Sequence, residues 1–304
     1  MASADHQGYK RAMRTQIVGV VLAACAGLIF PAVEAASPGE RQGSLIELLV
    51  RGDDMGVAQS VNAACITAYR KGIVRSVEVI VPGAWFPDAV RLLKENPGLD
   101  VGVHLCLTSE WDRCKWRPLT LAPSLVDSNG FFRAMTRQRA DFPPNTGFLE
   151  AGPRLDDVER ELRAQIEVAK RNIANVTHVS AHMGTAVCTP ELRALVERLC
   201  TEYGLLYRDE QLRYAQGFSG SQKSAAEKEH DLVKLLEGLN PGRWLIVEHP
   251  AYDTPEIRAM GHRGYENVAE DREGVTRAFT SAAVLEVIRR RGIRLISYAD
   301  LVRN

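Results

Sequence analysis

Two adjacent carboxylates follow an apolar run near the start of the chain. The segment LLVRGDDMG, residues 48–56, leads from aliphatic residues into Asp53 and Asp54. Neighbouring like charges repel each other, so one explanation is a turn or a helix N-cap, where Asp is favoured. The other explanation is a metal or acid/base site at the carboxyl end of a strand.

Three histidines take similar positions in other apolar segments. His104 lies near the end of DVGVHLCL, His182 directly follows VTHVSA, and His249 ends WLIVEH. A single strand histidine is more often a hydrogen-bonded core residue than a ligand. Three of them at strand ends, opposite an Asp pair, indicate a metal site. One Asp with two His keeps positions open for water and substrate, as a hydrolytic site needs.

The two carboxylates should divide the work between them. Successive side chains diverge on an extended segment, so one Asp can bind the ion while its neighbour accepts a proton. His249, just before Pro250, can act as a general acid because its unperturbed pKa is near neutrality. The alternative is a structural histidine packed beside the proline.

The segment THVSAHMGT contains a second histidine, His178. If the segment is extended, His178 and His182 share a face but stand about 13 Å apart, too far to bind one ion. We favour His182, which is closer to the strand end, and keep His178 as the alternative ligand. His6, His230 and His262 receive no role.

Short apolar runs alternate with helical patterns along the rest of the chain. Helical patterns lie between most of the strand-like runs, which are 44–50, 73–81, 100–107, 176–181, 205–208, 244–249 and 293–298. This order predicts an α/β fold with about seven parallel strands, in a barrel or a doubly wound sheet. No linker interrupts the alternation, so residues 44–304 form one domain. The segment 111–153 has no clear element and is expected to cover the active face.

The N-terminal region has a different composition. Lys10, Arg11 and Arg14 precede the apolar run IVGVVLAACAGLIFPAV, which small residues follow. This pattern predicts a signal peptide over 1–36, cleaved near Ala35 or Ala36, and a linker over 37–43. The run is short for a membrane anchor, and lipoprotein processing at Cys25 is the second alternative. We expect an exported protein, periplasmic or secreted, with no membrane span after cleavage.

Bulk composition excludes several classes of function. The formal net charge is zero, so the chain lacks the excess positive charge typical of proteins that bind nucleic acid. No Gly-x-Ser-x-Gly elbow occurs, which disfavours a serine hydrolase. Five cysteines remain after the signal without a Cys-x-x-Cys pair, and a disulfide such as Cys106–Cys114 stays open. A homo-oligomer is also left open.

Several motifs together resemble the YdjC/ChbG-like carbohydrate deacetylases, which are related in chemistry to the NodB-type polysaccharide deacetylases. The resemblance spans residues 45–301 and rests on GDDMG with its following helix, LDVGVHLCLTSEW, THVSAHMGT, WLIVEHPAYD and RRRGIRLISYADL. It implies a distorted (β/α) barrel with one divalent ion, Mg²⁺ or Zn²⁺. By resemblance Asp54, His104 and His182 bind the ion, Asp53 is the catalytic base, and His249 is the histidine of the His-Pro segment.

The implied reaction is hydrolysis of the N-acetyl group of an amino sugar such as a chitooligosaccharide. The chain departs from the family pattern His-x-Asp-x-His-x-His, because Ser180 replaces the Asp and Gly184 replaces a His. Two other hypotheses therefore stay open. One is a non-catalytic carbohydrate-binding protein on the same fold, and the other is a metal-dependent hydrolase of a different amide or ester.

Overall fold

The computed structural model describes residues 45–207 and 212–302. The predicted signal peptide over 1–36, the linker over 37–43 and Cys25 lie outside these residues.

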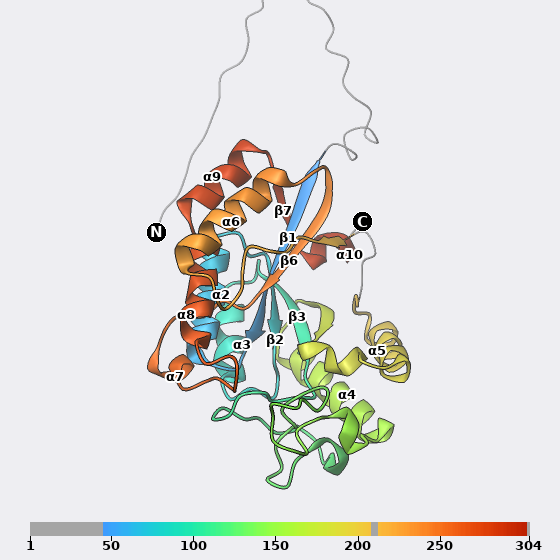
Figure 1. Ribbon diagram of the computed structural model, residues 1–304. Coiled ribbons are helices and arrows are strands. Elements are labelled where there is room, and N and C mark those ends of the chain that lie inside the picture. Colours follow the sequence, from blue (N-terminus) through green and yellow to red (C-terminus); the bar gives the residue numbers. More distant parts are fainter. Residues whose placement is uncertain (1–44, 208–211, 303–304) are drawn as a thin grey trace, which may run out of the picture. The chain divides into compact units, whose positions relative to one another are not determined.

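A curled, parallel seven-stranded sheet forms the centre of the domain (Figure 1). The strands are hydrogen-bonded in the order β4-β3-β2-β1-β6-β5, and β7 pairs with β1. Helices flank this half-barrel, so the expectation of a distorted (β/α) barrel is confirmed. The strands are β1 (Ile46–Met55), β2 (Ser76–Val79), β3 (Asp100–Leu105), β4 (Val176–Ala181), β5 (Leu212–Tyr214), β6 (Gly242–Glu248) and β7 (Arg294–Ile296).

Helices follow most strands and cover the sheet. They are α2 (Gln59–Lys71), α3 (Phe86–Lys94), α4 (Leu155–Asn172), α5 (Pro190–Tyr203), α6 (Ala225–Gly238), α7 (Pro255–Arg258), α8 (Val268–Phe279), α9 (Ala282–Arg290) and α10 (Tyr298–Val302). Their ends follow capping chemistry. The Thr189 side chain accepts from the Leu192 N–H at the start of α5, and Gly204 ends that helix with φ 65°.

The hydrophobic core surrounds β1, because this strand lies in the middle of the sheet. Leu48, Leu49 and Val50 are fully buried, as expected for a parallel strand covered on both faces. Along α4, Val158, Leu162, Ile166 and Ala169 are buried at helical spacing. These contacts fix the central strand on which the two carboxylates lie.

One predicted strand is wrong. In the predicted strand 205–208, the described residues 205–207 make only an isolated parallel bridge, between Leu206 and His178. The strand next to β6 is instead β5, at Leu212–Tyr214.

The long segment 111–153 contains only two 3₁₀ turns, η1 (Pro123–Leu125) and η2 (Leu149–Ala151). In Figure 1 it lies beyond the arrowheads of β2 and β3. The buried carboxylate of Glu161 on α4 accepts from the Leu119 and Thr120 N–H groups and anchors it. The Thr136 hydroxyl contacts the Thr185 hydroxyl in the turn after β4. The segment thus covers the strand ends, as expected.

Two glycines allow the loops after β1 and β2 to touch. Gly56 has φ 101°, a left-handed conformation that glycine tolerates best. Its carbonyl oxygen accepts from the Trp85 N–H at 2.9 Å. A Cβ atom on Gly83 would lie 2.3 Å from the same carbonyl oxygen. The loop directly after the Asp pair is therefore seated against backbone that leaves no room for a side chain at position 83.

Replacing Gly83 by alanine is expected to lower the free energy of unfolding by about 1–3 kcal/mol, because rigid backbone must move to admit the methyl group. Chemical denaturation measures the change. Gly238→Ala is the matched control, since no atom lies within 4 Å of its added Cβ. Equal stability of the two variants would contradict the tight contact.

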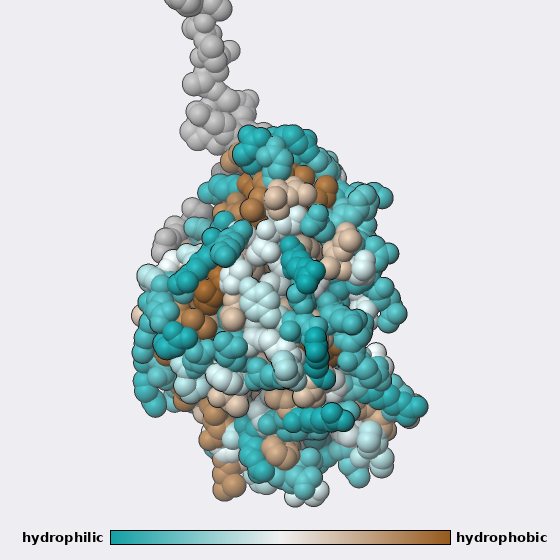
Figure 2. Space-filling model, turned by 90° about the vertical axis from the view of Figure 1, so that its left-hand side faces the viewer, coloured by the Kyte–Doolittle hydropathy of each residue, from teal (hydrophilic) through white to brown (hydrophobic). Residues whose placement is uncertain are grey.

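The outer surface is mostly polar on the face drawn in Figure 2, where hydrophobic residues appear in separate groups. Among the large hydrophobic residues that the structure describes, Leu121 in the segment 111–153 is the most exposed, at 85%. Within residues 45–207 and 212–302, no helix combines the length and apolar character needed to cross a membrane.

Candidate metal centre

Asp53 and Asp54 lie at the carboxyl end of the central strand β1, which ends at Met55. The pairing of β1 with β2 shifts register between Gly52 and Met55, and Asp54 has φ 69°. This left-handed residue rotates the chain, so both carboxylates reach the same imidazole. His104 Nε2 lies 3.7 Å from Asp53 Oδ2 and 3.7 Å from Asp54 Oδ1. The expectation that the two side chains diverge is therefore wrong at this position.

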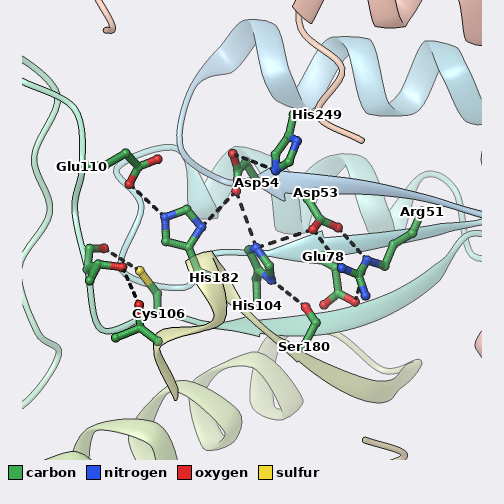
Figure 3. A network of polar contacts seen from close by, with 12 residues as sticks. Arg51, Asp53, Asp54, Glu78, His104, Cys106, Glu110, Ser180, His182 and His249 are labelled. Carbon is green, nitrogen blue, oxygen red and sulfur yellow. Dashed lines mark hydrogen bonds and ion pairs between the residues drawn. The ribbon is translucent and has the colours of Figure 1, made fainter. Parts of the chain in front are cut away.

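Three side chains from three elements converge here (Figure 3). Asp54 comes from β1, His104 from β3 and His182 from the start of η3 (His182–Val187). Their candidate ligand atoms all lie within 4.8 Å of one another, and all three residues are buried. His182 Nδ1 is 3.3 Å from Asp54 Oδ1. This donor set, one carboxylate oxygen and two imidazole nitrogens, suits a divalent cation.

The oxygen at the centre of the group fits such an ion. Asp54 Oδ1 is buried and has no hydrogen-bond partner among the described residues. Its other oxygen, Oδ2, is paired with Arg272 Nη2 at 2.9 Å. A buried carboxylate oxygen without a donor is costly, and a cation at this position would remove the cost.

Each histidine has a partner on the nitrogen that faces away from Asp54. His104 Nδ1 lies 2.6 Å from Ser180 Oγ, and His182 Nε2 lies 2.9 Å from Glu110 Oε2. When the partnered nitrogen carries the proton, the opposite nitrogen of the neutral ring is available to bind a metal. The free nitrogens are Nε2 of His104 and Nδ1 of His182.

The surroundings shift the pKa values of Asp54, His104 and His182 in different ways. Burial opposes ionisation of Asp54, but Arg272 and His249 hold its pKa well below the usual range. Burial lowers the pKa of His104. Burial acts in the same direction on His182, but Glu110 overcomes it and raises the pKa of His182 well above the ordinary value. Asp54 is thus ionised, as a metal ligand must be.

Asp53 belongs to a different network. Arg51 donates to both of its carboxylate oxygens, from Nε at 2.7 Å and from Nη2 at 3.0 Å. Arg51 Nε also lies 3.6 Å from Glu78 Oε1, and Arg51 Nη1 donates to the Tyr298 hydroxyl. This bidentate pair fixes Asp53 beside the candidate metal position without using it as a ligand.

Glu78 makes the buried network sensitive to acid. Burial raises its pKa, but His178 and Arg51 outweigh this effect and lower the pKa from 4.5 to about 2. A folded-state pKa below the unfolded one stabilises the fold above the unfolded pKa. This stabilisation is lost as pH falls through the folded pKa.

The free energy of unfolding is therefore expected to fall by roughly 3 kcal/mol through Glu78 as the pH drops from about 5 to 2. Urea unfolding at a series of pH values measures this slope. In Glu78→Gln the slope should be shallower over the same range. Parallel curves for the two proteins would show that Glu78 does not cause the acid sensitivity.

His249 lies at the exposed edge of the group, with its side chain 39% exposed. Its Nε2 is 4.0 Å from Asp54 Oδ2, and its Nδ1 is 3.8 Å from Glu248 Oε2. Burial opposes protonation of His249, but Asp54 prevails and raises the pKa. A protonated His249 at this edge can donate a proton to a bound molecule.

His178, the alternative ligand, does not join the group. Its Nε2 lies 2.8 Å from Glu78 Oε1, and its ring stacks on Tyr298 with centroids 3.8 Å apart. It is a buried structural residue inside the half-barrel. The cysteines of the described residues are all free, so no Cys106–Cys114 disulfide forms.

Two charged neighbours of the ligands were missed from the sequence. Glu110 lies in the loop after β3, and Arg272 lies on α8. Arg272 has no strand-end position to suggest it. Glu110 could have been suspected, because it follows His104 by six residues in the quoted motif LDVGVHLCLTSEW.

Several named proteins are similar in sequence to most of this chain. A carbohydrate deacetylase of Oceanobacillus iheyensis is 35% identical over 241 residues, covering 79% of this chain and 94% of the relative. One from Thermus thermophilus is 33% identical over 235 residues, 70% of this chain and 80% of the relative. A chitooligosaccharide deacetylase of Yersinia enterocolitica is 29% identical over 270 residues, 83% and 98% of the two chains.

A solved structure has the same fold. The crystal structure of an Enterococcus faecalis protein, with a proposed role in cellobiose-phosphate cleavage, superposes with a TM-score of 0.68 at 23% identity. It covers 85% of this chain and 99% of the other. The family model described as YdjC-like protein matches residues 47–290. The chain thus belongs to the family of YdjC-like proteins.

Proposed function

We propose that this protein hydrolyses the N-acetyl group of amino sugars such as chitooligosaccharides, with a divalent metal ion held by Asp54, His104 and His182. One observation carries the proposal. The unpartnered Asp54 Oδ1 lies 3.3 Å from His182 Nδ1 and 3.7 Å from His104 Nε2, with Asp53 beside them. The deacetylase relatives support the reaction class.

The side chains have separate roles in this hydrolysis. An ion bound by the three ligands would activate water and polarise the acetyl carbonyl. Asp53, held by Arg51 through two hydrogen bonds, accepts the proton of the attacking water. Because both Asp53 oxygens are already oriented, little motion is needed when the proton moves.

His249 completes the acid/base pair from the exposed edge. The amide nitrogen of the substrate must gain a proton before it leaves as an amine. His249 is more exposed than the three ligands, so a sugar entering from solvent meets it first. Burial opposes protonation of His249, but Asp54 raises its pKa, and this favours the protonated form that can donate.

We also propose that the protein is exported. The N-terminal pattern predicts export, which would place the sugar substrate in the periplasm or outside the cell. The donor set suits Zn²⁺, whereas Mg²⁺ prefers oxygen ligands and bound water.

Elemental analysis of the purified protein, run beside an acetate-release assay on a panel of N-acetylated saccharides, tests the proposal. We expect one divalent ion per chain and acetate release from at least one chitooligosaccharide. Sugar binding without turnover, under every divalent metal tried, would favour the non-catalytic hypothesis. Cleavage only of other amides or esters would favour a different hydrolase.

A further inference from the structure

The two histidines of the candidate centre are held unequally. His104 Nδ1 contacts the neutral hydroxyl of Ser180 at 2.6 Å, whereas His182 Nε2 contacts the carboxylate of Glu110 at 2.9 Å. A carboxylate acceptor makes an imidazole a stronger electron donor than a hydroxyl does. His182 should therefore be the stronger of the two nitrogen ligands.

We infer that Glu110 is a positioning residue of the metal centre, which holds His182 with Nδ1 directed at Asp54 Oδ1 and sets the affinity for the ion. This inference rests on the metal centre of the proposed function. Glu110 is not one of the three proposed ligands and acts on the ion through His182.

The local structure explains why His182 needs such a partner. Strand β4 ends at Ala181, and the backbone then turns sharply through Met183 and Gly184, with φ 52° and 69°. His182 is thus the first residue beyond the sheet, without the strand pairing that fixes His104 on β3. The indole of Trp116 packs against its ring edge at 5.9 Å between centroids, but this contact does not select a tautomer.

Glu110 is itself well placed to act as an anchor. It is 5% exposed and lies where the covering segment begins, between the buried residues Ser109 and Trp111. His182 Nε2 lies 2.9 Å from Glu110 Oε2. A carboxylate there accepts from Nε2–H, and the neutral ring that binds an ion then has its lone pair on Nδ1. Contact with Glu110 therefore selects the tautomer that faces Asp54.

Charge gives Glu110 a second effect. Arg272, 4% exposed, lies 2.9 Å from Asp54 and places a positive charge beside the cation position. Glu110 supplies a compensating negative charge on the opposite side of His182. Its removal should weaken cation binding through lost orientation and through lost charge together.

The test is titration of the metal-stripped full chain with Zn²⁺ and, separately, with Mg²⁺. We expect Glu110→Ala to weaken binding of the ion about 10–100-fold. Glu110→Gln, which keeps an acceptor oxygen but no charge, should fall between that variant and the wild type. Ser180→Ala should have a smaller effect than Glu110→Ala.

Glu161→Gln is the matched control. Glu161 is a buried glutamate that accepts backbone N–H groups of the covering segment and contacts none of the three ligands. It should bind the ion as the wild type does. Thermal unfolding of each metal-free variant shows whether it folds. If Glu110→Ala does not fold, the metal titration of Glu110→Gln alone tests the inference.

Nitrogen-15 spectra of the histidine side chains add a readout independent of affinity and activity. With metal bound, the wild type should show a protonated Nε2 on His182, and Glu110→Ala should lose its hydrogen-bonded shift. Wild-type binding with less than a threefold change in both Glu110 variants would overturn the inference. An Nε2 of His182 without a proton would overturn it too. Failure of the wild type to bind either ion would instead reject the metal centre of the proposed function.

Discussion

Replacing Asp53 by asparagine is expected to lower the rate of acetate release by about 10²- to 10⁴-fold, the usual contribution of a general base. The amide has nearly the shape of the carboxylate but cannot accept the proton. Because Asp53 pairs with Arg51 and is not one of the three ligands, the variant should still bind one ion. Initial rates with saturating sugar and the metal content of the same sample measure both effects.

A matched control is Asp157→Asn. Asp157 is a buried carboxylate that accepts from Ser124, in the covering segment. It should retain most of the activity. If Asp53→Asn slowed the reaction less than tenfold, another group would have to be the base. If it lost the metal as well, Asp53 would be a ligand.

Replacing Asp54 by asparagine is expected to have the largest effect, which is loss of stoichiometric metal and of all acetate release above background. The variant also leaves Arg272 buried without its carboxylate partner. Removing one partner of a buried ion pair typically costs about 3–5 kcal/mol. We therefore expect both the metal content and the free energy of unfolding to fall.

The double variant Asp54→Asn with Arg272→Met separates the loss of metal from the loss of stability. The second change removes the unpaired charge, so part of the stability should return. The metal should not return, since the ligand oxygen is still replaced. Metal binding by the double variant would mean that Asp54 is not a ligand. No recovery of stability would mean that the Asp54–Arg272 pair contributes little to the fold.

The sequence could predict which three side chains meet at the candidate metal centre, because the apolar runs identify the strands. Apolar runs in the sequence indicate β1, β3, β4 and β6. The carboxyl ends of parallel strands lie at one edge of the sheet, so the polar residues at these ends lie close together. His182 was preferred to His178 by the same argument, and the structure pairs His178 with Glu78 instead.

The remaining parts of the site depend on tertiary contacts. Arg272 reaches Asp54 from a helix more than 200 residues later, and no local pattern distinguishes it from other helical arginines. The left-handed conformation of Asp54 has no signal either, since isolated Asp residues adopt both signs of φ. The short strand β5 was misplaced because LLYR, residues 205–208, is more apolar than Leu212–Tyr214.

The positive φ of Asp54 places two opposing demands on a single position. Glycine is the residue that this backbone prefers, and left-handed geometry costs other residues about 1 kcal/mol or more. Glycine offers no ligand atom. Among side chains with a ligand oxygen, aspartate is one of the few that tolerate φ 69°. A substitution to glycine should therefore be better tolerated by the fold than one to alanine, although neither residue offers a ligand oxygen. Selection for stability alone would drive this position away from the residue that the chemistry needs.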